Sequence, residues 1–160
     1  MKAWHTLAHV AVDPLPPDWR DQLAARLGER PRRIGPWAEL ALYGARLCLD
    51  QAREPILPIG VQLRMASLSG PKSATQSIIE QARAGLPKPF SFMQSQPSHA
   101  LAVLSQHLAW QGDARFMLCG DKREVLELAQ QECEALDAPG LLIGWVEEDQ
   151  RTQWSRLLLG

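Results

Sequence analysis

Gln94, Ser95 and Gln96 are the residues whose position first suggests chemistry. They lie in the segment 88–121, whose pattern predicts a strand, a tight corner, a helix and a second strand. In many α/β enzymes such a corner displays a nucleophile, and acyl transfer there needs a polarised thiolate or an activated hydroxyl group. A glutamine amide forms hydrogen bonds but cannot be acylated. These residues therefore predict a corner with a structural or orienting role.

Three further side chains are candidates for catalysis, and each has a structural alternative. Ser95 could be a serine nucleophile, although no G-x-S-x-G motif surrounds it. Cys119 precedes Gly120 at the end of a predicted strand, where nucleophiles do occur, but the apolar letters "FML" before it favour an inert thiol in the core. His99 lies in the first turns of the helix after the corner, where it could assist a catalytic group or form a structural hydrogen bond.

The other histidines and the cysteines predict neither a metal site nor a disulfide framework. His5 and His9 share one face of the first predicted strand, but the sequence offers no third ligand at a suitable spacing. Cys48, Cys119 and Cys133 are an odd number without C-x-x-C spacing, so we expect reduced thiols that pack in the core. No cofactor is implied.

Composition predicts one globular domain, residues 1–160, in the cytoplasm. Hydrophobic residues make up 46% of the chain, charged residues make up 22%, and the net charge is −1. Because Arg30, Arg32 and Arg33 form the only local basic cluster, nucleic acid is not an expected partner. We identify no signal peptide and no apolar run of the roughly 20 residues that a membrane span requires.

Hydrophobic periodicity supplies the elements that must position these side chains. We expect strands at 4–12, 56–68, 90–95 and 114–120 and helices at 19–28, 36–52, 72–86, 97–112 and 121–137, followed by a hairpin formed by 140–149 and 152–160 with a solvated connection at Glu147, Glu148 and Asp149. Trp37, Trp110, Trp145 and Trp154 suit either the core or an interface. Strands that alternate with helices predict an α/β fold, with a mostly parallel mixed sheet, helices on both faces and a C-terminal β-hairpin.

The stretch "FSFMQSQPSHALAVLSQHLAWQGDARFMLCGD" resembles the nucleophile elbow of β-ketoacyl synthases in the thiolase-like superfamily. That elbow consists of a hydrophobic strand, a corner with cysteine and a helix that leads into "GDAD" and a buried strand ending in two glycines. This chain has "GDAR" and one glycine, Gly120. The upstream stretch "LRMASLSGPKSATQSIIEQARAGLPKPFSF" is similar to the N-terminal domain of chain-length-factor-type proteins of aryl polyene pathways. The resemblance covers most of residues 35–148 and implies a thiolase-like half-fold.

The resemblance also implies a function. Depending on the register, the family cysteine falls at Gln94, Ser95 or Gln96, and chain length factors often replace it with glutamine. We therefore expect a non-catalytic subunit that pairs with an active β-ketoacyl synthase of fatty-acid, polyketide or aryl polyene synthesis, or that forms a homodimer, with acyl carrier protein as a further candidate partner. Phe90 and Phe92 would lie near the dimer seam or the acyl tunnel.

Two alternatives remain beside this expectation. The first is a small acyltransferase or hydrolase that uses Ser95 or Cys119 as its nucleophile. The second is a homodimeric binding module without a link to such a pathway.

Overall fold

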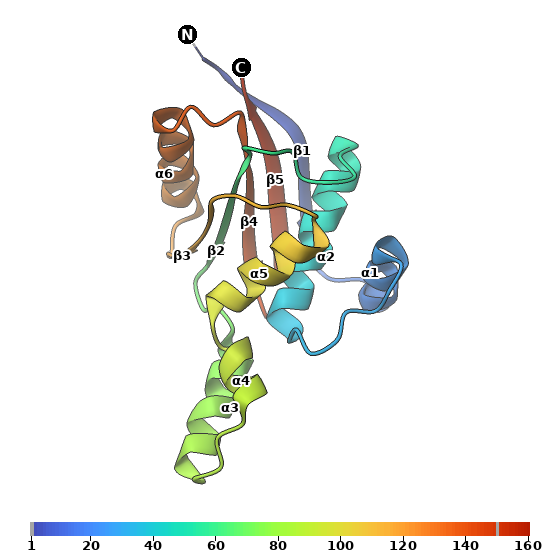
Figure 1. Ribbon diagram of the computed structural model, residues 1–160, viewed down its shortest axis with the longest axis vertical. Helices are drawn as coiled ribbons and strands as arrows, with labels where there is room; N and C mark the ends of the chain where they lie inside the picture. Colours follow the sequence, from blue (N-terminus) through green and yellow to red (C-terminus); the bar gives the residue numbers. More distant parts are fainter. Residues whose placement is uncertain (1, 150) are drawn as a thin grey trace.

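A single five-stranded sheet organises the chain. The structure is a computed structural model that describes residues 2–149 and 151–160. The strand order is β1-β5-β4-β2-β3 (Figure 1). β2 is parallel to both β3 and β4, whereas β5 is antiparallel to β4 and β1. The strands are β1 (Trp4–Val12), β2 (Gln62–Ser67), β3 (Ala114–Leu118), β4 (Gly140–Glu147) and β5 (Arg151–Leu159).

The helices divide unequally between the two faces of the sheet. α2 packs against β1, β4 and β5 and also contacts α1 and α5, and α5 contacts β3, whereas α6 packs against β2 and β4 (Figure 1). α6 lies on the other face from α2 and α5. The helices are α1 (Trp19–Leu27), α2 (Pro36–Ala52), α3 (Lys72–Arg83), α4 (Pro89–Gln94), α5 (Pro97–His107) and α6 (Lys122–Ala135). Each helix in the described part of the chain is too short or too polar to span a bilayer.

The hydrophobic core has two parts, one on each face of the sheet. The larger cluster joins α2 and α5 to the sheet and includes Trp37, Trp110 and Trp154, which are all buried. The smaller cluster lies under α6 and includes Val125 and Cys133. The structure thus assigns these three tryptophans to the core, whereas Trp145 stays half-buried beside the smaller cluster.

Most of the predicted elements are confirmed. Ten of the eleven elements in the described residues occur where the sequence predicts them, with ends that differ by up to six residues. The first helix, α1, ends as expected, because Gly28 adopts a left-handed conformation with φ of 76°, as is common just after a helix. The mixed sheet, the helices on both faces and the C-terminal hairpin of β4 and β5 are also confirmed.

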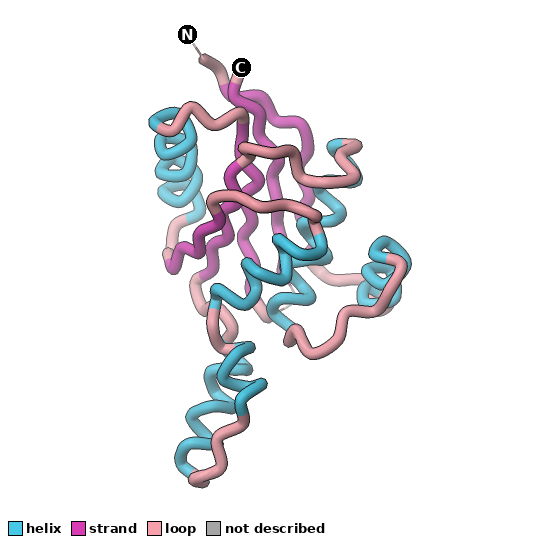
Figure 2. The backbone as a smooth tube through the Cα atoms, in the orientation of Figure 1, coloured by secondary structure: helices cyan, strands magenta, loops and turns pink. Residues whose placement is uncertain are grey.

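The predicted strand at 90–95 is wrong, because these residues form helix α4. Phe92 N donates to Lys88 O at 3.2 Å and Ser95 N donates to Ser91 O at 3.1 Å, which is helical bonding. Pro89 occupies a first-turn position, where its missing N–H has no cost. The apolar alternation of Phe90 and Phe92 suits a strand equally well, but α4 lies beyond the sheet, next to α3 (Figure 2), so no neighbouring strand is available.

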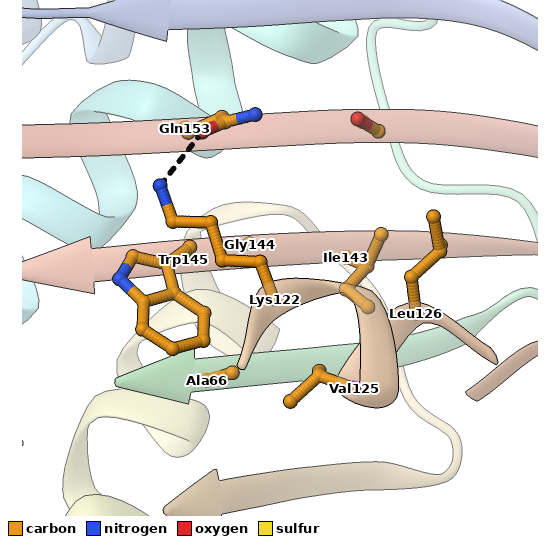
Figure 3. Close-up of a pocket in the computed structure, with 9 residues that line it drawn as sticks. Ala66, Lys122, Val125, Leu126, Ile143, Gly144, Trp145 and Gln153 are labelled. Atoms are coloured by element: carbon orange, nitrogen blue, oxygen red, sulfur yellow. Dashed lines mark hydrogen bonds between the residues drawn. The ribbon is translucent and has the colours of Figure 1, made fainter. Parts of the chain in front are cut away.

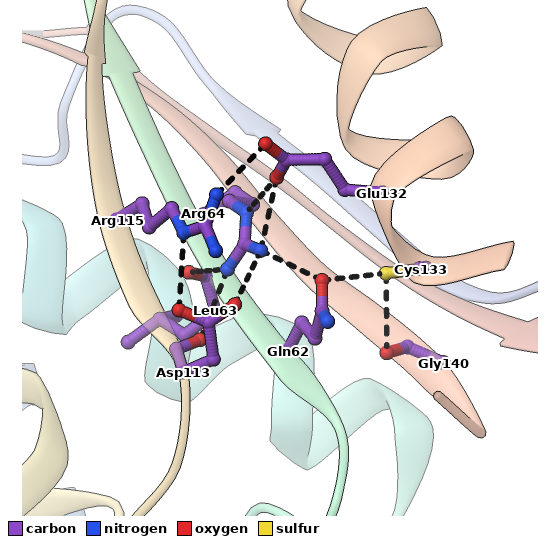
Figure 4. Close-up of polar contacts among 8 residues, drawn as sticks. All are labelled: Gln62, Leu63, Arg64, Asp113, Arg115, Glu132, Cys133 and Gly140. Atoms are coloured by element: carbon purple, nitrogen blue, oxygen red, sulfur yellow. Dashed lines mark hydrogen bonds and ion pairs between the residues drawn. The ribbon is translucent and has the colours of Figure 1, made fainter. Parts of the chain in front are cut away.

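A buried arginine ties α6 and the loop before β3 to β2 (Figure 4). The Arg64 side chain is fully buried and donates to Glu132 Oε2 of α6 at 3.0 Å and to Asp113 Oδ2 at 2.8 Å. It also donates to Gln62 Oε1 at 2.7 Å and to two backbone carbonyls, of Leu63 and Asp113. Because its donors have partners, the charge is tolerated in the interior.

Candidate functional site

The carboxyl ends of β2, β3 and β4 lie at the same edge of the sheet, because these three strands are parallel. In open α/β sheets, ligands bind in the crevice beyond such ends. Here the edge carries the loop 68–71 after β2, the corner 119–121 after β3 and the connection that begins at Glu148 after β4. We therefore take this edge as the candidate site.

The corner between β3 and α6 has the order of elements that the sequence placed at 88–121. The strand β3 ends at Leu118, and Cys119 and Gly120 form the turn. Asp121 then caps α6 by accepting from Arg123 N at 2.8 Å, as N-cap aspartates do. A short turn after α6 leads into the buried strand β4. The strand, corner, helix and buried strand that the resemblance implies are therefore formed by residues 114–147, so the predicted position of the corner was wrong.

Cys119 occupies this corner but lacks the partners of an activated nucleophile. It is half-buried and packs against the smaller core cluster, so the expectation of a core thiol is confirmed only in part for this cysteine. Its Sγ lies 3.6 Å from Asp121 O and 3.8 Å from Glu124 Oε2, both of which are acceptors, and 3.5 Å from Asp121 N. The Asp121 N–H group donates to the sulfur, the single S–H can donate to only one of the two acceptors, and no histidine or cation is bonded to Sγ among the described residues.

The other two cysteines are confirmed as core residues. Burial raises the pKa of Cys48 to about 12 and the pKa of Cys133 to about 11, because a buried thiol resists ionisation. Both thiols are fully buried, and Cys133 Sγ donates to Gln62 Oε1 at 3.1 Å. Neither is a nucleophile at neutral pH.

Glu147 holds the loop after β2 in place. Its carboxylate is buried and accepts from Ser67 Oγ at 3.0 Å and from the backbone N–H groups of Leu68 and Ser69. Ser67 Oγ in turn accepts from Gly70 N at 2.7 Å. The expectation that Glu147 is solvated is therefore wrong, because its acceptors serve the loop at the end of β2.

Lys122 and Trp145 line three adjoining cavities at this edge and under α6. The cavities have volumes of about 330, 210 and 120 Å³. Lys122 Nζ donates to Gln153 Oε1 at 3.1 Å and lies 5.4 Å from the centroid of the Trp145 ring (Figure 3). The smallest cavity is mainly apolar, with Val125 and Ile143 in its lining. Such a surface can bind a ligand.

The predicted site residues Gln94, Ser95, Gln96 and His99 lie at the junction of α4 and α5. Gln94 Nε2 donates to Arg33 O at 3.1 Å, and His99 Nε2 lies 3.2 Å from Ile34 O, so both support the loop before α2. Ser95 Oγ donates to Phe92 O at 2.7 Å and accepts from Gln96 Nε2 at 3.0 Å. They lie between two helices and not at a strand-to-helix corner, so the elbow assignment is wrong.

Phe90 and Phe92, the predicted interface or tunnel residues, are exposed on α4, with exposed fractions of 52% and 61%. The guanidinium carbon of Arg33 lies 5.3 Å from the centroid of the Phe90 ring. A role at an interface stays a prediction, although a strand seam at these residues is excluded by their helical conformation.

The predicted first-strand histidines are on β1. His9 Nδ1 lies 2.7 Å from Ser155 Oγ on β5. Within residues 2–149 and 151–160, no three histidine, cysteine or acidic side chains are grouped so that they could bind a metal ion.

The corner at Cys119 could have been located from helix-capping rules. Asp121 precedes an amphipathic helix with Glu124 in its first turn, which is a typical helix start. The apolar letters "FML" directly before Cys119 end a strand. This pattern places the corner at Cys119 and Gly120.

Comparison with known proteins identifies the class of fold. No family model and no curated protein matches the sequence. The fold is similar to that of the ketosynthase ApeO in complex with its chain length factor ApeC, from Xenorhabdus doucetiae, with a TM-score of 0.73, 14% identity and coverage of 98% of this chain and 79% of that chain. The protein therefore has a thiolase-like half-fold, an α/β half-fold built on a mixed sheet.

Two further structures support the same class. The ishigamide ketosynthase/chain length factor matches with a TM-score of 0.72 at 11% identity, over 98% of this chain and 58% of that chain. The tetronic acid condensing enzyme AbyA1 matches with a TM-score of 0.52 at 16% identity, over 99% of this chain and 55% of that chain. The present chain thus spans little more than half the length of these two proteins, and the likeness is one of fold.

Proposed function

We propose that this protein is a non-catalytic, chain-length-factor-type subunit that pairs with an active β-ketoacyl synthase in fatty-acid, polyketide or aryl polyene synthesis. The observation that carries the proposal is the free edge of β3, which lies next to the corner at Cys119 in a fold similar to that of a ketosynthase in complex with its chain length factor.

The free edge of β3 presents backbone N–H groups that face away from β2. Leu63 N donates to Asp113 O and Cys119 N donates to Ser67 O, so the odd-numbered residues of β3 face β2. Because backbone N–H groups alternate in direction along a strand, those of Ala114, Phe116 and Leu118 face away from β2. Unprotected strand edges invite pairing. A strand of a partner subunit would satisfy these groups.

The absence of catalysis is supported by the surroundings of Cys119. Condensation needs a polarised thiolate and imidazole donors that stabilise the carbanion formed by decarboxylation. In the described part of the chain, the hydrogen bonds of the Cys119 thiol involve only Asp121 and Glu124, and those of the His9 and His99 rings involve Ser155 and Ile34. The proposed role is therefore to pair with the active subunit and bound its acyl tunnel.

Leu118→Pro is expected to weaken co-purification with the cognate ketosynthase at least tenfold. Leu118 is 70% exposed. Proline at this position removes an outward N–H group while leaving the bonds to β2 intact. The change should be measured as the dissociation constant for the tagged ketosynthase.

Leu128→Ser is the matched control, because Leu128 is an exposed leucine on α6 rather than on β3. It should bind like the wild type. Equal binding of Leu118→Pro and the wild type would exclude the β3 edge as the seam, and a wild-type chain that binds no ketosynthase would refute the pairing itself.

A second candidate, a small acyltransferase or hydrolase, is favoured by one observation: Cys119 lies at a strand-to-helix corner, where a nucleophile would be displayed. In that reaction the Cys119 thiolate would attack an acyl thioester, form a new thioester and release the original thiol. Ser95 is the weaker nucleophile candidate, because its hydroxyl donates to the Phe92 carbonyl between two helices.

Incubation with acetyl- and octanoyl-coenzyme A is expected to leave the wild-type mass unchanged, because Cys119 lacks an activating partner. Iodoacetamide should still alkylate Cys119 ahead of the buried Cys48 and Cys133, since alkylation needs an accessible thiolate. Intact-mass spectrometry measures both reactions. A stable acyl adduct that Ser95→Ala retains and Cys119→Ala loses would replace the proposed function with the enzymatic one.

A further inference from the structure

The smallest of the three cavities lined by Lys122 and Trp145 lies between α6 and the sheet (Figure 3). Its walls come from α6 and from β2, β4 and β5, and most of them are apolar, including Ala66, Val125 and Ile143. Neither Cys119 nor any residue of β3 lines it. The cavity is therefore separate from the corner and from the free edge of β3.

This cavity has room for a small apolar group. Its volume is about 120 Å³, which is close to the roughly 150 Å³ of an apolar cavity that stays dry and accepts benzene. Val125 and Ile143 are buried, and Leu126 packs against the same core cluster. Because the core holds these walls in place, the cavity is formed before a ligand arrives. An apolar group about the size of a benzene ring or a short alkyl chain would fill it.

The rim of the cavity is polar on the side of β5. Lys122 Nζ donates to the Gln153 amide oxygen across this rim, and Ser155 Oγ lies 2.7 Å from His9 Nδ1. Within residues 2–149 and 151–160, the Lys122 ammonium group forms no ion pair. An ammonium group has three donors, so Lys122 can bind an anion and keep its bond to Gln153.

Charge distinguishes this cavity from its two neighbours. Among the described residues, its lining contains the cation Lys122 and no carboxylate. The cavities of about 330 and 210 Å³ instead combine cations with carboxylates, which are Glu147, Glu148 and Asp149 in the first and Asp13 in the second. A single anionic group is therefore favoured at the rim of the smallest cavity and disfavoured beyond it.

We propose that this cavity binds a small amphiphilic carboxylate. Its apolar group would lie between α6 and the sheet, and its carboxylate would accept from Lys122 Nζ at the rim. The volume sets the size of the apolar group, and the unpaired cation sets the charge of the head group. The inference goes beyond the proposed function and does not depend on it, because it involves this chain alone and no residue of β3.

Hexanoate added to the full-length chain is the probe. We expect a dissociation constant on the order of 1 mM for a ligand of this size. In NMR spectra the methyl signals of Val125, Leu126 and Ile143 should shift, whereas those of Leu104, which is buried on the other face of the sheet, should not. Hexanamide has the same apolar chain without the charge, and it should bind about fivefold more weakly.

Two variants separate the charge from the cavity. Lys122→Gln should weaken the binding of hexanoate about fivefold and leave that of hexanamide unchanged. Leu126→Trp should abolish the binding of both, because the larger side chain fills the cavity. Leu126 is half-buried, and circular dichroism should show that this variant stays folded. Lys72→Gln is the matched control, because Lys72 is also the first residue of a helix and lines the neighbouring cavity but not this one. It should bind hexanoate like the wild type.

Three results would overturn the proposal. Equal affinity of the wild type for hexanoate and hexanamide would exclude a preference for an anion. Unchanged methyl signals at about 20 mM hexanoate, where a site of this affinity would be nearly full, would exclude the site, and equal shifts at the exposed Leu118 and Leu136 would indicate general adsorption. Methyl signals that shift as the protein is concentrated without hexanoate would assign the cavity to a second copy of this chain. The proposed function survives each of these results, since its own test is binding of the ketosynthase.

Discussion

Gly144→Ala is expected to lower the free energy of unfolding by about 3 kcal/mol in urea denaturation. A Cβ atom at residue 144 would lie 2.3 Å from Cε2 of Trp154, which is fully buried. The ring is held in place because its Nε1 donates to Thr152 Oγ1 at 3.0 Å. Gly44 of α2 approaches the same ring, since its own added Cβ would lie 2.5 Å from Cδ1. The methyl group therefore forces β4, β5 or α2 to move.

Gly120→Ala is the matched control for this substitution. The nearest atom to its added Cβ is Leu68 Cδ1 at 3.9 Å, which is ordinary contact. We expect a change within about 0.5 kcal/mol. Trp154→Leu should partly suppress the effect of Gly144→Ala, with a coupling energy of about 1 kcal/mol or more in a double-mutant cycle. If Gly144→Ala had the same free energy of unfolding as the wild type, Trp154 would not pack against β4 in this way.

Arg64→Met is expected to cost about 3 kcal/mol of stability in the same measurement. Methionine fills much of the volume but leaves Gln62 Oε1 and the carbonyl of Leu63 without this donor. The carboxylate of Glu132 also loses its hydrogen bond from Arg64. Asp113 and Glu132 keep Arg115 as a partner, and Asp113 has a side chain that is 36% exposed. Solvent therefore limits the loss.

Arg115→Gln is the control, because this arginine pairs with the same two carboxylates from a side chain that is 51% exposed. It should cost clearly less than Arg64→Met, because solvent screens an exposed ion pair. If both substitutions cost the same, burial of Arg64 would not be the reason for its effect.

The cost of Arg64→Met should also depend on pH. Burial alone would raise the pKa of Asp113, but hydrogen bonds and charge from Arg64 and Arg115 outweigh it and hold this pKa below its ordinary value. The stabilisation is therefore complete above about pH 4 and is lost as pH falls through the lowered pKa. The difference between wild type and Arg64→Met should narrow as pH falls from neutral to about pH 3.

Elements with a strong local pattern could be predicted from the sequence. α1 and α2 have clear ends at Gly28 and Pro36, and β4 is a continuous apolar run, as expected of a strand that is buried on both faces. The α/β class of fold follows from the order of these elements, whereas the half-fold was implied by the resemblance. The candidate site was harder to predict, because its parts are far apart in the sequence. The corner at Cys119 belongs to a site only because β2 and then β4 lie next to β3 in the sheet.

The sequence alone therefore determined most of the elements and the α/β class of fold, since these depend on periodicity and chain order, and its motifs carried the resemblance to ketosynthases. The tertiary structure decided three other points. It made α4 a helix because no strand lies beside it, it buried Glu147 and Arg64 because their partners come from distant loops and helices, and it moved the corner from Ser95 to Cys119. Each depends on which neighbours the fold supplies, and a local pattern does not contain that information.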